Sequence, residues 1–209
     1  MSNEKGQLIV ISAPSGAGKT SIIKNVIKKL NDENIKSTFS VSHTTRLPRD
    51  GDIDGSDYFF VSNEIFDELY EAGNFIETAE VHDYKYGTSK NFIDENINQG
   101  INVFLEIDVQ GFQKLRNRNI EFRSMFILPP SIEELRKRIQ KRGLDSEDVI
   151  EKRMKNALKE LGEAEEYDYL VINDVFEQAI EELLEMIINK GFKDQTHDKK
   201  LKILQDLLS

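Results

Sequence analysis

A glycine-rich segment near the N-terminus has the residue types and the spacing of a phosphate-binding loop. It reads Ala13-Pro14-Ser15-Gly16-Ala17-Gly18-Lys19-Thr20. Backbone N–H groups of such a loop point inward, and the start of the following helix adds partial positive charge, so a polyphosphate fits there. Lys19 would reach the outer phosphates, and the Thr20 hydroxyl would bind Mg²⁺ directly. The segment therefore predicts a nucleotide-phosphate site.

The loop departs from the usual pattern at one position, because Ala13 stands where the first glycine is expected. A methyl group is tolerated there if the local φ is negative, and Gly16 and Gly18 remain for the tight positions. The alternative is a chance Gly-Lys-Thr in a turn. The apolar run 8–11 before the loop and the helical pattern 22–30 after it favour the phosphate-binding loop.

Two groups of arginines could bind further phosphates. Arg46 and Arg49 follow a predicted short strand and could form a fork for another phosphate, since guanidinium groups bind such oxygens in bidentate fashion. A second basic stretch covers residues 136–142. Its plain alternative is a solvated helix face, which we favour for Lys137 and Lys141.

The order of elements predicts an α/β fold with a mostly parallel central sheet and helices on both faces. Ligands of such sheets bind at the carboxyl ends of the strands. We expect the glycine loop, Ser42, Asp108 and Asn173 to meet at that edge, because each follows a predicted strand. Residues 41–91 are richer in strands than their neighbours, which predicts a small mixed insert. Residues 42–57 within it have the composition of a loop.

The C-terminal residues 192–209 carry Leu201, Leu204 and Leu208 at helical spacing. This pattern predicts a terminal helix that packs on the domain or frays, with a partner-binding motif as the alternative.

Composition narrows the class of protein. The chain has 209 residues, no cysteine and a net charge of −10. The charge argues against a protein that coats nucleic acid, which needs a broad basic surface. Neither an apolar signal-peptide region nor a run of about 20 apolar residues is evident, so we expect no membrane association and a cytoplasmic location.

The chain resembles the guanylate kinases, and in particular the bacterial members of that family. The resemblance runs in family order over nearly all of residues 7–190, and bacterial members often carry alanine at the Ala13 position. The matching segments are Ser12 to Lys19, Ser40 to Arg46, Gly55-x-x-Tyr58-x-Phe60-Val61, Phe75-Ile76-Glu77, Tyr86-Gly87-Thr88, Ile107-Asp108-x-Gln110-Gly111, Phe126 to Ser131, Arg138, Arg142-Gly143, Lys152-Arg153-Met154 and Val171 to Asp174.

The resemblance implies a P-loop nucleoside monophosphate kinase that moves the γ-phosphoryl group of ATP to GMP, and also to dGMP, with Mg²⁺. It implies a role in guanine nucleotide synthesis and recycling. It also implies three moving parts within a domain of residues 7–189, followed by a helical tail at 190–209. These parts are a core (7–40, 92–132 and 163–189), a GMP-binding lobe (41–91) and a helical lid (133–162).

The family's functional residues carry over position by position. On the donor side, the resemblance implies that ATP meets Ala13, Pro14, Ser15, Gly16, Ala17, Gly18, Lys19, Thr20 and Asn173. The catalytic groups would be Lys19, Arg138, Arg142 and Arg153. The GMP phosphate would meet Arg46, Arg49, Tyr58 and Tyr86, and the guanine would meet Ser42, Glu77, Thr88 and Asp108. Asp108, together with Glu106, would also position metal-bound water.

Three points stay open at this stage. Glu77 taken alone fits a surface acid on a strand equally well. Asp52 stands where many relatives have glutamate, and the shorter acid could orient either the arginines or a water. The alternative function is a non-catalytic guanylate-kinase-like module that binds phosphopeptides, against which the retained Lys19 and Thr20 argue.

Overall fold

The main sheet of the molecule has five parallel strands in the order β2-β7-β1-β8-β9. The structure is a computed structural model that describes residues 5–81, 83–118, 120–141, 146–189, 192 and 194–208. The predicted catalytic residue Arg142 lies outside these residues. The strands are β1 (Leu8–Ser12), β2 (Ser37–Phe39), β7 (Asn102–Glu106), β8 (Arg123–Leu128) and β9 (Tyr169–Ile172).

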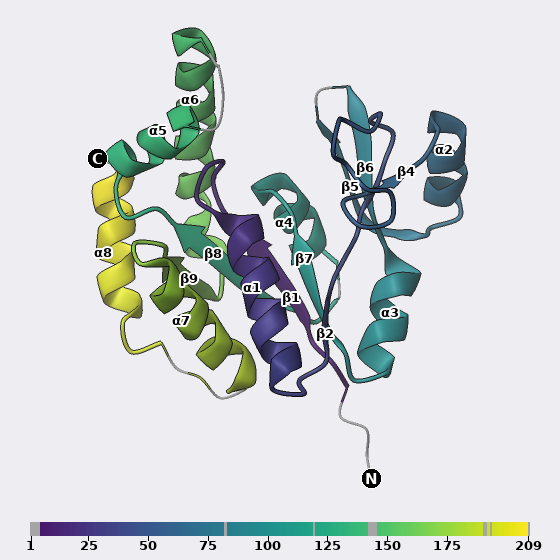
Figure 1. Cartoon of the computed structure of the whole chain (residues 1–209), viewed down its shortest axis with the longest axis horizontal. Helices are drawn as coiled ribbons and strands as arrows, with labels where there is room; N and C mark the ends of the chain where they lie inside the picture. The colour runs from purple at the N-terminus through teal and green to yellow at the C-terminus, as the bar shows by residue number, and fades with distance from the viewer. Residues whose placement is uncertain are drawn as a thin grey trace.

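The central strand β1 is buried along its whole length, because helices cover both faces of the sheet. Successive side chains of a strand point to opposite faces. Ile9 and Ile11 therefore pack in one buried cluster with Val26 and Leu183, and Val10 packs in the other. Figure 1 shows the helices on both sides: α1 (Lys19–Asp32), α3 (Lys90–Asn98), α4 (Val109–Arg116), α7 (Phe176–Ile188) and α8 (His197–Leu208).

A second, mixed sheet of four strands has the order β4-β3-β6-β5. Its strands β3 and β4 pair in parallel, and β6 pairs antiparallel with both β3 and β5. The strands fall within the segment 41–91 that was predicted as a mixed insert, and one helix accompanies them. The bounds are β3 (His43–Thr44), β4 (Phe59–Phe60), α2 (Asn63–Glu71), β5 (Phe75–Val81) and β6 (Tyr84–Ser89).

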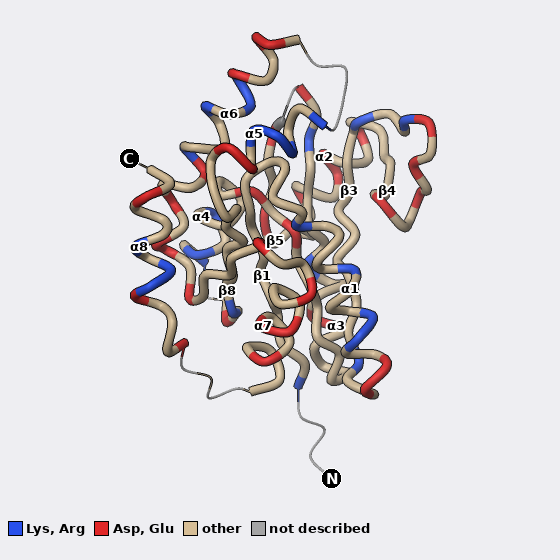
Figure 2. Tube along the Cα trace, turned by 60° about the vertical axis from the view of Figure 1, so that its left-hand side comes forward, with Lys and Arg blue, Asp and Glu red and all other residues tan. Residues whose placement is uncertain are grey.

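Two further helices, α5 (Ile132–Lys141) and α6 (Glu147–Gly162), lie on the side of the molecule away from the second sheet. In Figure 1 the N-terminal end of α1 stands between these two helices and the second sheet. The Ser131 hydroxyl accepts a hydrogen bond from the Glu134 N–H at 3.1 Å, which satisfies one free donor at the start of α5. A single 3₁₀ turn, Ala164–Glu166, follows α6. In Figure 2 the basic residues of α5 stand out in blue.

Three expectations need correction. The segment predicted as loop at 42–57 contains the short strand β3, which pairs with β4 and β6. Helix α4 was not anticipated, because Asp108 was interpreted only as a site residue although its side chain caps that helix. The tail does form a helix, α8, but it buries Leu207 with Leu204, and Leu208 is exposed.

No helix in the described part of the chain is long and apolar enough to cross a membrane.

Candidate active site

The glycine loop connects the end of β1 to the start of α1 at the carboxyl edge of the main sheet. Gly16 and Gly18 adopt φ values of 93° and 86°, which favour glycine, whereas Ala13 is not among the described residues with positive φ. A side chain at Gly18 would also come within 2.8 Å of the Asn173 amide nitrogen. The loop backbone therefore accepts alanine at position 13 and requires the two glycines.

Lys19 and Thr20 both face the end of β7. The Lys19 ammonium group lies 3.4 Å from the Ile107 carbonyl oxygen and 3.7 Å from a Glu106 carboxylate oxygen. The Thr20 hydroxyl donates to the same Glu106 oxygen at 2.9 Å. A cation and a hydroxyl–carboxylate pair thus lie side by side at the mouth of the loop.

Asn173 follows β9 and joins the loop from the opposite side. The side-chain amide of Asn173 donates to the Ala17 carbonyl oxygen at 2.7 Å. The backbone carbonyl oxygen of Asn173 accepts from the Arg138 guanidinium at 3.2 Å. Arg138 is also bound to Glu134, one turn earlier in α5, at 2.8 Å. The end of β9 thus links the loop to the first helix of the α5–α6 pair.

Arg153 of α6 approaches the loop directly. Its guanidinium lies 3.5 Å from the Ser15 hydroxyl oxygen. Lys137 and Lys141 of α5 are exposed, as expected of a solvated face. The structure therefore brings Arg138 and Arg153, from two different helices, to the same glycine loop.

A small cavity of about 270 Å³ lies between the second sheet and the end of β7. Glu77 contributes a carboxylate that is only 4% exposed, so the interpretation of this residue as a surface acid is wrong. The Thr88 hydroxyl donates to Glu77 at 2.5 Å and lies 3.5 Å from the Ser42 hydroxyl. The walls of the cavity are Ser42, Tyr58, Glu77, Ala79, Tyr86, Glu106, Ile107 and Asp108.

The environment of Glu77 disfavours its charge. Burial raises the pKa of the Glu77 carboxyl above its ordinary value, and the neighbouring Asp108 raises it further. The hydrogen bond from Thr88 acts in the opposite direction but does not cancel the effect of burial. Such a carboxylate gains from a ligand that offers hydrogen-bond donors to it.

Arg46 is buried and fixed beside this cavity. Its guanidinium lies over the rings of Tyr58 and Phe60, with its central carbon 5.3 and 5.5 Å from the ring centres. Asp52 accepts hydrogen bonds at 2.8 Å from the Arg46 side chain and from the backbone N–H of Arg49. These bonds hold the pKa of the Asp52 carboxyl below its usual range. Asp52 thus orients Arg46, while the Arg49 residue is exposed.

A second cavity, of about 480 Å³, extends from the start of α1 to the second sheet. Lys19 and Thr20 line one end of it, and Ser42 and Tyr58 line the other. It shares Ser42, Tyr58, Glu106, Ile107 and Asp108 with the small cavity. The cavity beside Lys19 and Thr20 and the predicted base pocket are therefore neighbours that share one wall. Asp108 is held at this junction because it accepts a hydrogen bond from the Gly111 N–H at 2.8 Å.

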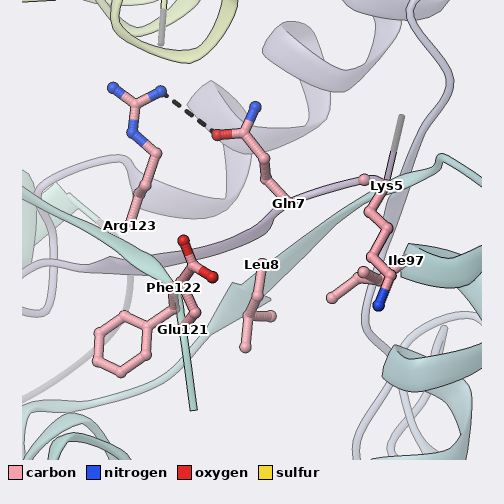
Figure 3. A pocket seen from close by; sticks show the side chains of 8 residues that line it. Lys5, Gln7, Leu8, Ile97, Glu121, Phe122 and Arg123 are labelled. Carbon is pink, nitrogen blue, oxygen red and sulfur yellow. Dashed lines mark hydrogen bonds between the residues drawn. The ribbon is translucent and has the colours of Figure 1, made fainter. Parts of the chain in front are cut away.

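Another cavity, of about 720 Å³, lies at the opposite end of β1 and is shown in Figure 3. Arg123 faces Gln7 across it, with 3.5 Å between the guanidinium and the amide oxygen. Among the described residues, none of those predicted for the site lines this cavity. The site therefore lies at the carboxyl edge of the sheet.

Sequence reasoning missed one group near the loop. Glu160 of α6 lies close to the charge of Lys19 and to the backbone N–H of Ser15. The available signal was its spacing, since Arg153 and Glu160 are two helical turns apart and share one face of a helix.

Comparisons with known proteins agree on one family. The family model described as guanylate kinase matches residues 5–190. A guanylate kinase of Caldanaerobacter subterraneus subsp. tengcongensis is 46% identical over 204 residues, covering 97% of both chains. A guanylate kinase of Escherichia coli K12 is 44% identical, covering 97% of this chain and 99% of its own. The crystal structure of guanylate kinase from Anaplasma phagocytophilum superposes with a TM-score of 0.69 at 30% identity, covering 97% of this chain and 95% of its own.

Proposed function

This chain belongs to the guanylate kinase family, and we propose that it transfers the γ-phosphoryl group of ATP to GMP, giving ADP and GDP. The observation that carries the proposal is the wall that the two cavities share, which sets the proposed base pocket next to Lys19 and Thr20. An acceptor whose base occupies the small cavity has its phosphate directed toward Lys19, because the residues between them line both spaces. The reaction needs this end-to-end placement of donor and acceptor.

The small cavity fits guanine by its hydrogen-bonding chemistry. Guanine offers an N1–H and an exocyclic amino group, and both are donors that carboxylates such as Glu77 and Asp108 accept. Adenine presents an acceptor at N1, so the buried Glu77 would lose its partner. A site built in this way rejects the wrong base strongly, since its buried polar groups would be left unpaired. Ser42 and Thr88 complete the proposed base contacts.

We assign the GMP phosphate to the aromatic and basic side chains next to that pocket. Arg46 is already desolvated and oriented by Asp52, so little ordering is required when a phosphate binds. Tyr58 and Tyr86 pack edge to face and point their rings along the same cavity wall. Arg49 would add a second guanidinium from the exposed side of the lobe.

The donor phosphates are assigned to the glycine loop, with Lys19 on the outer phosphates and Asn173 on the nucleoside side. The site also fits Mg²⁺, because the Thr20 hydroxyl and the Glu106 carboxylate are hard oxygen donors 2.9 Å apart. Thr20 would bind the ion directly, and Glu106 and Asp108 would hold its water ligands. When bound, Mg²⁺ neutralises charge on the phosphates of ATP.

Transfer then requires neutralisation and exclusion of water. A phosphate oxygen of GMP attacks the γ-phosphorus, the bond to the β-γ bridging oxygen breaks, and ADP leaves. Lys19 together with Arg138, Arg142 and Arg153 would stabilise the negative charge on the transferred group. Closure of the lobe and the lid would align the two nucleotides and keep water away from the γ-phosphorus.

A coupled assay with GMP, dGMP, AMP, CMP and UMP as acceptors tests the proposal. We expect turnover with GMP and dGMP and almost none with the other three. Equal turnover with AMP would refute the base assignment. The phosphopeptide-binding alternative is not favoured, since it does not require Lys19, Thr20 and Glu106 to be assembled at the loop. A cytoplasmic location stays a prediction, which cell fractionation would test.

A further inference from the structure

Helix α6 presents two charged side chains of opposite sign to the phosphate loop. Arg153 lies 3.5 Å from the Ser15 hydroxyl, and Glu160 lies two turns further along the same face. Both line a cavity of about 900 Å³ together with Ser15. The positive charge of Arg153 would attract an anion in that cavity, whereas the negative charge of Glu160 would repel it.

The Glu160 carboxylate is partly buried and is not fully hydrogen-bonded within the part of the chain that the structure describes. One of its oxygens is buried and has no hydrogen-bond partner among the described residues. Burial raises the pKa of the Glu160 carboxyl, Asp108 raises it further, and the charge of Lys19 and the N–H of Ser15 lower it. The groups that attract this carboxylate are therefore the same groups that the loop would offer to nucleotide phosphates.

We propose that Glu160 is a positioning residue that competes with the phosphates of the donor nucleotide for the positive charge of the loop. This inference rests on the proposed function. In the nucleotide-free protein the carboxylate partly neutralises Lys19 and faces Ser15. When ATP or ADP binds, its phosphates take over these partners, and Glu160 must move away with α6 or take up a proton.

The competition has a consequence for the reaction cycle. Because like charges repel in a partly buried site, an ionised Glu160 weakens the binding of both ATP and ADP. Weaker binding of ADP speeds its release after transfer, and release of product limits the turnover of many enzymes. Glu160 thereby adjusts nucleotide affinity without touching GMP, whose proposed pocket it does not line.

The decisive variant is Glu160→Gln, which keeps the shape and one acceptor oxygen but removes the charge. Titration calorimetry at pH 8 with ADP and excess Mg²⁺ should show about fivefold tighter binding than in the wild-type protein, and unchanged binding of GMP. Glu160→Asp, which keeps the charge, should bind ADP nearly as the wild type does. Glu165→Gln makes the same charge change at an exposed position nearby and should have no effect.

A pH series separates this role from a structural one. The gain in affinity of Glu160→Gln over the wild type should shrink toward one as pH falls from 8 through the raised folded pKa of the Glu160 carboxyl, because a growing share of the wild-type carboxyl is then protonated. Other titrating groups cancel in the ratio, since both proteins carry them. Those facing Glu160 from the packed elements are Lys19, Glu80, Asp108, Arg153, Lys159, Glu163 and Tyr167.

Three outcomes would overturn the inference. These are unchanged or weaker binding of ADP by Glu160→Gln at pH 8, an equal gain in Glu165→Gln, or a gain independent of pH. A change in melting temperature alone, with ADP affinity unchanged, also counts against it. Failure of the proposed function is distinguishable, because the wild-type protein would then bind no ADP or phosphorylate no GMP.

Discussion

The Lys19 ammonium group is bound by two oxygen atoms at the end of β7, one from Glu106 and one from Ile107. Its side chain is 17% exposed, so it is oriented before any nucleotide arrives. The free energy of these contacts is modest, because distances of 3.7 and 3.4 Å are long for hydrogen bonds, and the oxygen atoms of a phosphate can replace both. The group is thus positioned at little cost to the stability of the fold.

Replacement of this group gives the first prediction. Lys19→Met should lower kcat by several orders of magnitude and leave the melting temperature within a few degrees of the wild type, because charge on the transferred group loses its main partner. A coupled assay and thermal unfolding measure the two effects. Lys24→Met removes an exposed cation from the same cavity and serves as the control. Near-normal turnover of Lys19→Met would show that Lys19 does not bind the phosphates.

Glu77 illustrates a site residue that is held at the expense of stability. Its folded-state pKa is raised, so between the unfolded and the folded pKa the folded protein binds more protons. Stability therefore falls as pH rises through this window, and the full cost is present above both values. The loss of stability has a functional counterpart, because the ionised Glu77 carboxylate can accept hydrogen bonds from the proposed donor groups of guanine.

Glu77→Gln should separate the two effects. At pH 8 we expect a gain of about 1 kcal/mol in the free energy of unfolding, since a neutral amide is buried in place of a charge. GMP affinity should fall by roughly tenfold or more, because one accepting oxygen becomes a donor. The stability gain should disappear as pH falls through the folded pKa. Glu80→Gln, on the exposed side of the same strand, is the control, and a less stable Glu77→Gln at pH 8 would contradict the argument.

At the scale of the elements, helix α8 is attached to the core by apolar and ionic contacts. Leu204 and Leu207 enter the buried cluster that also contains Met154 and Leu161 of α6. Lys200 is 4% exposed and binds Asp194 at 2.7 Å and also Glu182 of α7. The tail therefore packs against the base of the helix that carries Arg153 and Glu160.

Lys200→Met tests the ionic part of this attachment. It leaves the buried Asp194 without its main partner and should lower the free energy of unfolding by about 3 kcal/mol at pH 7. The lysine helps hold the pKa of Asp194 below its ordinary value against burial, so the loss should fade as pH falls through the folded pKa. Lys199→Met, at an exposed neighbouring position, should change little. Denaturant unfolding measures both, and equal effects of the two variants would show that the ion pairs do not stabilise the tail.

The sequence predicted elements well where one strong signal governed them. The strands expected before the glycine loop, Ser42, Asp108 and Asn173 are present as β1, β2, β7 and β9 of the main sheet. Helix α4 was missed because it is short and has Gly111 in its first turn, and glycine lowers helix propensity. Strand β3 was missed because two residues carry no periodic pattern, and only pairing with β4 and β6 defines it.

The site was predictable at the level of residue types and less so in its contacts. A phosphate loop and an arginine fork have spacings that can be recognised in sequence. The partnership of Thr20 with Glu106, and the approach of Glu160 to Lys19, join residues far apart in the chain. Such contacts depend on how helices are placed on the sheet, which no local pattern specifies.

At the scale of the whole molecule, the second sheet and the α5–α6 pair stand on either side of the loop in Figure 1. Arg138 and Arg153 come from one side, and Arg46 and Glu77 from the other. If both sets act on a single pair of nucleotides, as we propose, the two sides must approach each other. The division into a core, a GMP-binding lobe and a lid stays a prediction.

Small-angle X-ray scattering tests this movement. GMP together with ADP and Mg²⁺ should reduce the radius of gyration relative to the nucleotide-free protein, because ligands contacted from both sides stabilise the closed form. AMP together with ADP should produce a smaller change. Identical scattering curves with and without GMP and ADP would contradict closure.

The base pocket is lined by three consecutive residues, Glu106, Ile107 and Asp108. The first two contact Lys19 or Thr20, and Asp108 caps the start of α4. A substitution there disturbs donor and acceptor at once, so this tripeptide is a poor starting point for engineering a new base preference. Ser42, Glu77 and Thr88 form a hydrogen-bonded group of their own, in which Thr88 donates to Glu77 and lies 3.5 Å from Ser42. Directed evolution toward other acceptors is therefore expected to accumulate changes in this group first, with the β7 terminus held constant.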